Sequence, residues 1–392
     1  MSATLPLADH DAPNVIPFER PQQARVLHVI NGEHYSGAER VQDLLALRLP
    51  ECGYNVGLAT LKPGRFEEVR LSVDSPLYNV HMRGRLDLRA VREVMRIARE
   101  GDYQLLHAHT PRTAMVTAIA SRWTGRPWVY HVHSPVSLDS GRVLQNRINS
   151  LVERWSLRSA ARAIVVSPTL LPYMKECGFA ADRLTCVPNG VPVCDSPRVA
   201  HSIDGDLTIG MVALFRPRKG IETLLESLAM LVSRGYQVRF HAIGSFETPD
   251  YEAEIHALVE RLDLQEHVDF VGFTADVAGE LNRLDAMVLP SLYGEGLPMV
   301  VLEAMAAGVP VVASHVEGIS TAIEHRESGL LVEPGSVSQL ATALEQFLNG
   351  EVDPIKFAAA SVNRHREIFS DLAMARGVAE VYAEVLEAVR LV

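Results

Sequence analysis

Two glutamates, Glu295 and Glu303, stand where a strand is expected to end, a glycine-rich turn follows and a helix begins, in PSLYGEGLPMVVLEAMAAGVPVVAS (290–314). Pro298 suits the first position of that helix and Gly308 its C-terminal cap. Such a turn offers free backbone N–H groups and the positive end of a helix dipole, which favour an anion such as a diphosphate. Carboxylates facing a phosphate would repel it, so we expect the glutamates to accept hydrogen bonds from hydroxyl groups. A nucleotide sugar carries both kinds of group.

Three cations, Arg216, Arg218 and Lys219, stand between another predicted strand end and helix, in ALFRPRKGIETLLESL (213–228). We expect them to point into the same region as the two glutamates, because ligands of such folds bind at the carboxyl ends of the strands. Loss of a nucleoside diphosphate leaves negative charge, which fixed cations stabilise well away from water. The alternative is that Arg216 and Arg218 form a solvated loop face.

Two H-x-H pairs, His107 with His109 and His131 with His133, occur near predicted strand ends. We expect His133 to lie at the end of its strand and His131 to point to the other side of that strand. His109 is interpreted as a structural, hydrogen-bonded residue. Zinc sites use histidine pairs of this kind, so a metal site is the alternative.

Short β-branched runs alternate with helical patterns along nearly the whole chain of 392 residues. Strands are predicted at RVLHVI (25–30) and WVYHVH, for example, and helices at 38–49 and 87–100. The alternation pauses at 187–206, which is rich in Pro, Gly, Asn and Asp, and then restarts. This pattern predicts an α/β fold of two doubly wound parallel-sheet (Rossmann-like) domains that face a cleft between them.

The predicted organisation has four parts. The first half, up to Asp195, carries 23 Lys and Arg against 19 Asp and Glu, whereas the second half carries 14 against 29. This electrical difference supports two folding units. The parts are a disordered N-terminal arm (1–24), an N-terminal domain (25–195), a C-terminal domain (196–370) and a terminal helix (371–392) packing back on the N-terminal domain.

Composition excludes several classes of protein. Hydrophobic residues make up 47% of the chain and mean hydropathy is +0.07, as in soluble globular proteins. No apolar stretch approaches the roughly 18 residues of a membrane span. The four cysteines form no CxxC pair and the N-terminus has no signal-peptide pattern, so a reduced cytoplasmic protein is expected. No basic stripe with interleaved aromatic residues appears, so nucleic-acid binding is not expected.

Together these segments resemble the retaining glycosyltransferases of family 4, which have the GT-B fold. The resemblance covers nearly the whole chain after residue 24, with the two-glutamate segment 290–314 as its most specific part. It extends to the first strand and glycine loop, to later segments of the N-terminal domain and to the lead-in to the glutamates. These are HVINGEHYSGAERV, HAHTPRTAMVTAIA, VYHVHSP, VVSPTLL, VPNGV and VGFTADVAGELNRLDAMVLPS.

The resemblance implies a role for each matching residue. Glu303 matches the glutamate that holds the ribose hydroxyls, and Glu295 the one that contacts the transferred sugar. Lys219 matches the pyrophosphate lysine, with Arg216 expected beside it, and His133 matches a histidine near the reacting sugar. The remaining donor-binding residues expected are Gly37 after the first strand and Gly296, Leu297, Pro298 and Met299 at the helix start.

The implied activity is transfer of a sugar from a nucleoside diphosphate sugar to a hydroxyl of a glycan or lipid-linked acceptor, as in bacterial cell-surface polysaccharide or glycolipid synthesis. The anomeric configuration would be retained, and the leaving phosphate would take the acceptor proton. Members of the family need no metal, so we expect neither a metal nor a cofactor.

The chain departs from the family pattern at two positions. Leu214 stands five residues before Lys219, where the family commonly has an arginine, and Phe246 stands where it often has a second glycine after Gly244. Two other functions stay open. One is a nucleotide-sugar isomerase (epimerase), and the other is a non-catalytic protein that binds nucleotide or glycan.

A row of arginines marks one face of the helix predicted at 87–100. Their spacing of four, three, four and three places them on one side. Such a row could hold anionic lipid headgroups, which would bring the protein to the inner face of the membrane, although a solvated face is the alternative. The row consists of Arg85, Arg89, Arg92, Arg96 and Arg99.

Overall fold

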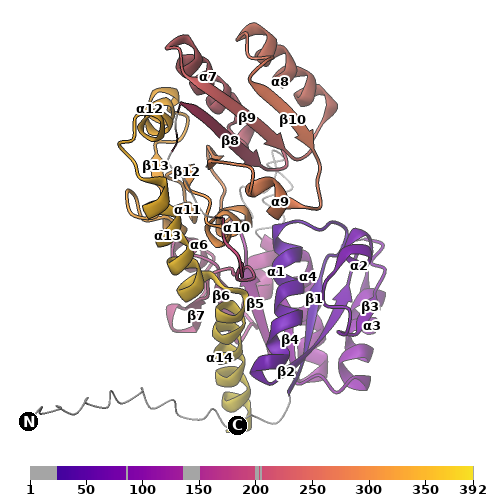
Figure 1. Ribbon diagram of the computed structural model, residues 1–392. Helices are drawn as coiled ribbons and strands as arrows, with labels where there is room; N and C mark the ends of the chain where they lie inside the picture. Colours follow the sequence, from indigo (N-terminus) through magenta and orange to yellow (C-terminus); the bar gives the residue numbers. More distant parts are fainter. Residues whose placement is uncertain (1–23, 85–86, 136–150, 199–202, 204, 392) are drawn as a thin grey trace, which may run out of the picture.

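The computed structural model describes residues 24–84, 87–135, 151–198, 203 and 205–391, which form two α/β domains (Figure 1). The chain passes from the first domain to the second after its seventh strand. It returns at the end, where the last helix, α14 (Asp371–Arg390), lies beside the first domain. The predicted α/β class with two doubly wound parallel sheets is confirmed.

The first sheet has seven parallel strands in the order β3-β2-β1-β4-β5-β6-β7. The strand order reverses between β1 and β4, and ligands of such sheets bind at the carboxyl ends of the strands beside this switch point. The strands are β1 (Ala24–Ile30), β2 (Tyr54–Thr60), β3 (Leu77–Asn79), β4 (Leu105–Ala108), β5 (Trp128–Val132), β6 (Arg162–Val165) and β7 (Leu184–Cys186).

The second sheet repeats this plan with six parallel strands in the order β10-β9-β8-β11-β12-β13. Its switch point lies between β8 and β11. The strands are β8 (Asp206–Val212), β9 (Gln237–Ile243), β10 (Val268–Gly272), β11 (Ala286–Leu289), β12 (Val311–Ser314) and β13 (Leu330–Val332).

Helices cover both sheets, which explains why the strands are nearly continuous apolar runs. In the first domain α3 packs on α4, while α1 packs on α14. The helices of this domain with described bounds are α1 (Gly37–Arg48), α2 (Arg65–Val69), α3 (Leu88–Glu100), α4 (Pro111–Thr124) and α6 (Leu170–Glu176). Those of the second are α7 (Ile221–Ser233), α8 (Pro249–Arg261), α9 (Val277–Leu281), α10 (Met299–Ala307), α11 (Ile319–Ala322), α12 (Val337–Leu348) and α13 (Pro354–Arg364).

Two predicted boundaries need correction. Ala24, assigned to the N-terminal arm, is the first residue of β1, because it pairs with Tyr54 and its N–H donates to the carbonyl of Gly53 at 3.2 Å. The rest of the arm, residues 1–23, lies outside the described residues. Pro298 is the N-cap of α10 rather than its first residue, because its ψ of 124° is extended.

The return of the chain to the first domain is held by backbone and ionic contacts. The N–H of Asp371 donates to the carbonyl of Val191 at 2.9 Å, and the N–H of Val191 donates to the carbonyl of Phe369 at 3.0 Å. The carboxylate of Asp371 also pairs with Arg48 of α1 at 2.6 Å. The start of α14 is therefore fixed both to the linker between the domains and to α1.

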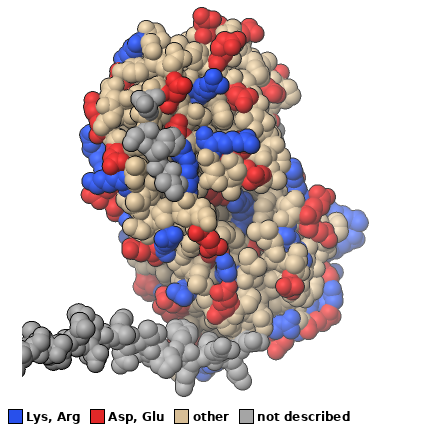
Figure 2. Space-filling view, in the orientation of Figure 1, with Lys and Arg blue, Asp and Glu red and all other residues tan. Residues whose placement is uncertain are grey.

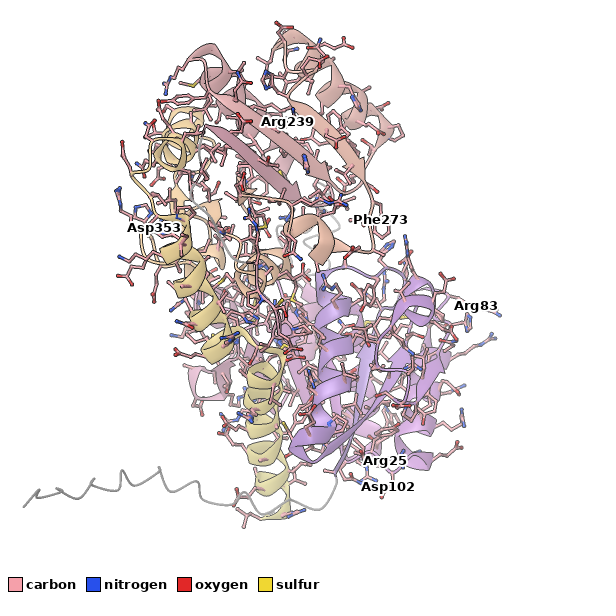
Figure 3. All side chains as sticks on the ribbon, viewed as in Figure 1. Arg25, Arg83, Asp102, Arg239, Phe273 and Asp353 are labelled. Atoms are coloured by element: carbon pink, nitrogen blue, oxygen red, sulfur yellow. The ribbon has the colours of Figure 1, made fainter. Side chains whose placement is uncertain are left out.

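Side chains also meet directly across the junction. The guanidinium of Arg65, in α2, lies 4.7 Å from the ring centroid of Phe273. Phe273 follows β10 and is labelled in Figure 3. A cation over an aromatic face is an attractive contact. Figure 2 shows the surface hollowed between the two domains. Within the described residues, no helix is long and apolar enough to cross a membrane.

Candidate active site

The cations and the first glutamate meet at the switch point of the second sheet. Lys219 ends a 3-10 turn after β8, and Glu295 lies in the loop after the neighbouring strand β11. The two loops touch through the N–H of Leu292, which donates to the carbonyl of Arg218 at 2.8 Å. Gly220 permits this approach, because its φ is +71° and a Cβ there would lie 2.2 Å from the carbonyl oxygen of Pro290.

Lys219 and Glu295 form a buried ion pair. Lys219 Nζ lies 2.5 Å from Glu295 Oε1, and their side chains are only 13% and 6% exposed. Ser291 Oγ donates to the same oxygen at 2.7 Å, and Arg218 approaches it at 3.5 Å. All three contacts go to Oε1, so within the described part of the chain Oε2 remains able to accept a hydrogen bond from a ligand.

These partners keep Glu295 ionised. Burial alone raises the pKa of a carboxyl, but the charge of Lys219, its hydrogen bond and that of Ser291 outweigh burial, so that the pKa of Glu295 is lowered. Glu295 therefore acts as an acceptor and not as a proton donor at neutral pH.

The loop that carries Glu295 is fixed from two sides. Glu317 Oε2 accepts hydrogen bonds from the N–H groups of Gly294 and Glu295, at 3.0 and 3.3 Å. On the other side Arg218 donates to the carbonyls of Tyr293 and Gly294, at 3.3 and 3.1 Å. The first N–H groups of the glycine-rich turn are therefore already hydrogen-bonded to a carboxylate of the protein, that of Glu317.

Glu303 lies on α10 and faces the first domain. Its Oε1 forms an ion pair with the guanidinium of Arg40, a residue of α1. The Glu303 side chain is only 13% exposed, so Arg40 supplies the counter-charge of a largely buried carboxylate. Burial raises the pKa of Glu303, and the charge of Arg40 opposes that shift only in part. Because the contact with Arg40 goes to Oε1, Glu303 Oε2 is able to accept hydrogen bonds from hydroxyl groups.

The starts of α1 and α10 face each other across the junction. A Cβ on Gly37, the first residue of α1, would lie 3.6 Å from Met299 Cγ, at the start of α10. Asn189 Nδ2 donates to the carbonyl of Leu297 at 2.8 Å. Because Pro298 has no N–H, it cannot bind a ligand through its amide as expected for this turn, whereas Leu297 and Met299 can.

His133 is in contact with the same turn. A Cβ on Gly296 would lie 1.8 Å from the carbonyl oxygen of His133, so only glycine allows the two segments to approach this closely. The expectation that His131 points to the other side of its strand is wrong. The His131 and His133 rings stack with centroids 4.6 Å apart, since residues two positions apart in a strand share a face.

The structure does not bring Arg216 to Lys219 and Glu295 as closely as Arg218. Arg216 lies 3.5 Å from Glu247, whereas Arg218 touches the Glu295 carboxylate and its loop. Leu214, at the position of the expected arginine, is 47% exposed. The alternative that Arg218 forms a solvated loop face is therefore wrong.

The arginine row lies on α3 with its charges partly engaged. Arg96 pairs with Glu93 at 2.5 Å and also with Glu100, and Arg99 donates to the carbonyl of Trp123 at 2.8 Å. Arg85 lies outside the described residues. Membrane contact through this row stays a prediction.

Sequence reasoning missed the residues that support the site. Arg40 comes from the other domain, and no spacing rule links it to Glu303. Glu317 lies beyond β12, and its role depends on a turn whose amides point toward it. A signal did exist for Ser291, which lies two residues after the end of β11 and four residues before Glu295.

Two facing parallel-sheet domains, with cations and carboxylates at the second switch point, define the GT-B class of glycosyltransferase. Residues 35–193 match the family "Glycosyltransferase Family 4", and residues 196–366 match "Glycosyl transferases group 1". The chain belongs to glycosyltransferase family 4, and the protein is a glycosyltransferase.

Individual relatives agree with this assignment. The glycosyltransferase EpsF of Bacillus subtilis is 29% identical over 366 residues, which cover 89% of this chain and 91% of EpsF. A phosphatidyl-myo-inositol mannosyltransferase of Mycolicibacterium smegmatis is 30% identical over 70% of each chain. Among solved structures, Anabaena HepE in complex with UDP and glucose is 25% identical, with a TM-score of 0.78 over 91% of this chain and 99% of HepE.

Proposed function

We propose that the protein transfers a sugar from a nucleoside diphosphate sugar to a hydroxyl of a glycan or lipid-linked acceptor, with retention of the anomeric configuration and without a metal or cofactor. The observation that carries the proposal is the cluster of Lys219, Arg218 and Glu295 at the switch point, with Glu303 on α10, the helix that begins four residues after Glu295. This cluster combines cations for phosphate with carboxylates for hydroxyl groups.

The cations serve the leaving group. When the bond between the sugar C1 and the diphosphate oxygen breaks, its electron pair stays on the diphosphate, whose added charge needs stabilisation. Lys219 has three N–H donors and uses one for Glu295, so two remain for phosphate oxygens. Arg218 adds a second charge, and the amides of Leu297 and Met299 add neutral donors at the start of α10. These groups would supply the positive charge that a metal supplies elsewhere.

The carboxylates and His133 orient the sugar and the nucleotide. Glu295 Oε2 would accept a hydrogen bond from a hydroxyl of the transferred sugar, and Glu303 would accept two from the ribose diol. The acceptor oxygen then bonds to C1 on the face that the diphosphate leaves, and the acceptor proton passes to the leaving diphosphate oxygen. His133, beside Gly296, would contact the sugar at the reacting end.

The named relatives support the substrate class. HepE has been solved with UDP and glucose and with UDP-glucose, which supports a nucleoside diphosphate sugar as donor. Relatives named for capsular polysaccharide, amylovoran and phosphatidyl-myo-inositol products support an acceptor of bacterial polysaccharide or glycolipid synthesis. Because the chain belongs to a glycosyltransferase family, the isomerase and the non-catalytic binder are disfavoured.

The test is donor turnover by Lys219→Ala, with Lys356→Ala as the matched control. Lys356 lies on the exposed side of α13, far in sequence from the site. UDP-, GDP- and ADP-sugars are supplied with and without an acceptor glycolipid extract, in buffer with EDTA. Loss of one such cation is expected to lower turnover about 100- to 1,000-fold, and the product anomer is read by NMR.

Each other outcome has a defined meaning. Full turnover by Lys219→Ala would overturn the assigned site. Conversion of the donor sugar without acceptor would indicate an isomerase, and donor binding without turnover would indicate a non-catalytic protein. Loss of activity in EDTA, or an inverted product, would overturn metal independence or retention.

A further inference from the structure

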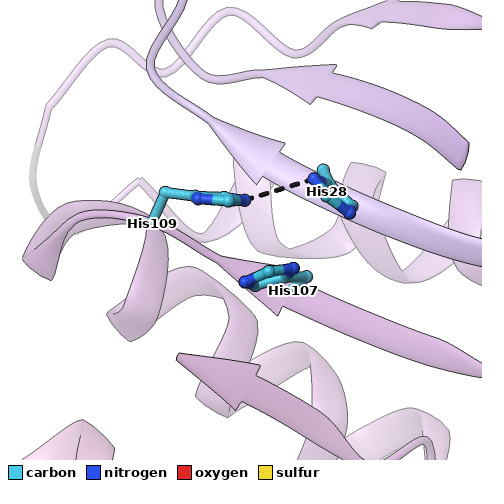
Figure 4. A group of neighbouring side chains, drawn as sticks. All are labelled: His28, His107 and His109. Atoms are coloured by element: carbon cyan, nitrogen blue, oxygen red, sulfur yellow. Dashed lines mark hydrogen bonds between the residues drawn. The ribbon is translucent and has the colours of Figure 1, made fainter. Parts of the chain in front are cut away.

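Five histidines and one tyrosine form a buried group beneath the junction between the domains. They come from three neighbouring strands of the first sheet and from α14. Figure 4 shows three of the histidine rings and the hydrogen bond between two of them. The group consists of His28 on β1, His107 on β4, His109 just after β4, His131 on β5, His133 just after β5 and Tyr382 on α14.

Five of these six side chains form one continuous hydrogen-bonded chain. His133 Nε2 lies 3.2 Å from His109 Nδ1, and His109 Nε2 lies 3.2 Å from His28 Nδ1. His28 Nε2 lies 2.9 Å from Tyr382 Oη, and the same oxygen lies 2.5 Å from His107 Nδ1. The order is therefore His133, His109, His28, Tyr382 and His107.

The ring geometry favours a hydrogen bond over a shared metal ion at the end of the chain nearest the site. The His109 and His133 rings are nearly coplanar, 14° apart, with centroids 5.5 Å apart. The distance between the centroids equals the 3.2 Å between His109 Nδ1 and His133 Nε2 plus the distance from each nitrogen to the centre of its own ring. The two nitrogens and the two ring centres therefore lie nearly on one line, and the nitrogens point at each other. Two ligands of a tetrahedral metal would meet at an angle instead. His131 stacks parallel on His133, and parallel ring planes do not share an in-plane ion.

The number of protons in the chain is fixed. Burial lowers the pKa of His28 to about 3 and that of His133 to about 4, and it also lowers the pKa of His107 and His109. At neutral pH the four imidazoles are neutral, so each carries one N–H, and Tyr382 carries one O–H. The four hydrogen bonds use four of these five protons. If Tyr382 Oη accepted both of its hydrogen bonds, its buried O–H would have no acceptor among the described residues, which is unfavourable. The fifth proton therefore lies on a terminal nitrogen, either His133 Nδ1 or His107 Nε2.

The two ends differ in their surroundings. Neither terminal nitrogen has a hydrogen-bond partner among the described residues. Both nitrogens are themselves buried, but the whole of His107 is buried, whereas the His133 residue is partly exposed and touches the turn that carries Glu295. An N–H that no ligand can approach stays without an acceptor, and buried donors without acceptors are rare. The fifth proton is therefore best placed on His133, the end of the chain that a bound ligand approaches.

We propose that His109, His28, Tyr382 and His107 are positioning residues that hold the proton of His133 on Nδ1, so that His133 meets the donor sugar as a hydrogen-bond donor and not as a base. The contact of His133 with the sugar rests on the proposed function, whereas the placement of its proton does not. Each link donates toward His133: His107 to Tyr382, Tyr382 to His28, His28 to His109 and His109 to His133.

Tyr382 connects this proton to the last helix of the chain. Its ring is fully buried and its hydroxyl bridges His28 and His107. Removal of the hydroxyl leaves three imidazoles with two hydrogen bonds and one proton that can lie at either end, His133 Nδ1 or His28 Nε2. The Tyr382→Phe protein should then contain both tautomers of His133.

The test is nitrogen NMR of full-length protein with 15N-labelled histidine, in which resonances are assigned by single histidine substitutions. In the wild type His133 should show protonated Nδ1 and bare Nε2. In Tyr382→Phe both shifts should move toward their average. Tyr54→Phe is the matched control, because the Tyr54 ring packs 5.2 Å from that of Tyr382 but does not belong to the hydrogen-bonded chain, and its His133 shifts should equal those of the wild type.

Kinetics give a second readout. One hydrogen bond is worth about 1 kcal/mol, so Tyr382→Phe should lower kcat about 3- to 10-fold with little change in the donor KM, while Tyr54→Phe keeps the wild-type kcat. A proton on Nε2 in the wild type, or shifts unaffected by Tyr382→Phe, would overturn the proposal. So would displacement of the histidine resonances by equimolar Zn²⁺, which would indicate a metal site. If no donor is turned over at all, the proposed function fails while the NMR result still decides the placement of the proton.

Discussion

Arg40 of α1 and Glu303 of α10 form an ion pair that joins the two domains next to the start of both helices. Their side chains are 32% and 13% exposed, so the carboxylate is the more deeply buried partner. The same carboxylate is expected to hold the ribose. Donor binding and domain contact therefore depend on one residue.

Arg40→Ala should destabilise the protein by leaving Glu303 without its counter-charge. Breaking a fully buried pair costs about 3–5 kcal/mol, and the partial exposure of Arg40 reduces this to about 1–2 kcal/mol. Urea unfolding measures the change. Arg96→Ala is the control, because Arg96 is 52% exposed and, among the described residues, its ion pairs lie within α3, so its loss should cost much less. Equal losses in the two variants would contradict the role given to Arg40.

Gly296→Ala should prevent the normal contact between the domains. A Cβ would lie 1.8 Å from the His133 carbonyl oxygen, and the atom it meets belongs to the backbone, which cannot rotate away. We expect turnover to fall at least about 100-fold, as for other small displacements of catalytic groups, and the radius of gyration from X-ray scattering to increase. Gly84→Ala, where a Cβ meets nothing within 4 Å, should match the wild type. Normal scattering and turnover for Gly296→Ala would show that the contact is dispensable.

The sequence was sufficient for the fold and for the residues that follow strand ends. Lys219 and Glu295 are 76 positions apart, yet their convergence follows from the neighbouring positions of β8 and β11 in a doubly wound sheet. Arg40 and Tyr382 could not be found in this way. Their partners are in another domain or in a distant strand, and the packing of whole domains, not local spacing, brings them together.

The choice between Arg216 and Arg218 illustrates the same limit. Both stand in one loop. The family's arginine position is taken by Leu214, and Arg216 was expected to replace that arginine, but the structure places Arg218 against Glu295 and its loop carbonyls. Arg218→Ala should therefore lower kcat/KM for the donor about 100-fold, whereas Arg216→Ala should cost less than about 10-fold, since Arg216 lies 3.5 Å from Glu247. Steady-state kinetics with the best donor decide between them, and the reverse order would restore the assignment made from the sequence.

The buried histidines should make stability fall in mild acid. Burial lowers the pKa of His133 from 6.5 to about 4, and it lowers the pKa of His131 as well. The unfolded chain therefore binds more protons than the folded chain below pH 6.5, so stability is full above that pH and is lost as the pH falls toward about 4. Each such histidine contributes about 1.4 kcal/mol per pH unit over this range, and His133 about 3 kcal/mol in all.

His131→Phe tests this dependence, because His131 stacks on its neighbours and neither of its nitrogens has a hydrogen-bond partner among the described residues. In the variant, the change in the free energy of unfolding per pH unit should be smaller by about the contribution of one histidine. Urea unfolding at a series of pH values between 6.5 and about 4 measures this change. His256→Phe is the control, because the exposed ring of His256 also packs on an aromatic ring, with its centroid 4.3 Å from that of Phe270. It should keep the wild-type slope. If His131→Phe and the wild type lose stability equally with falling pH, the neutral state of this buried histidine is not what makes the fold acid-sensitive.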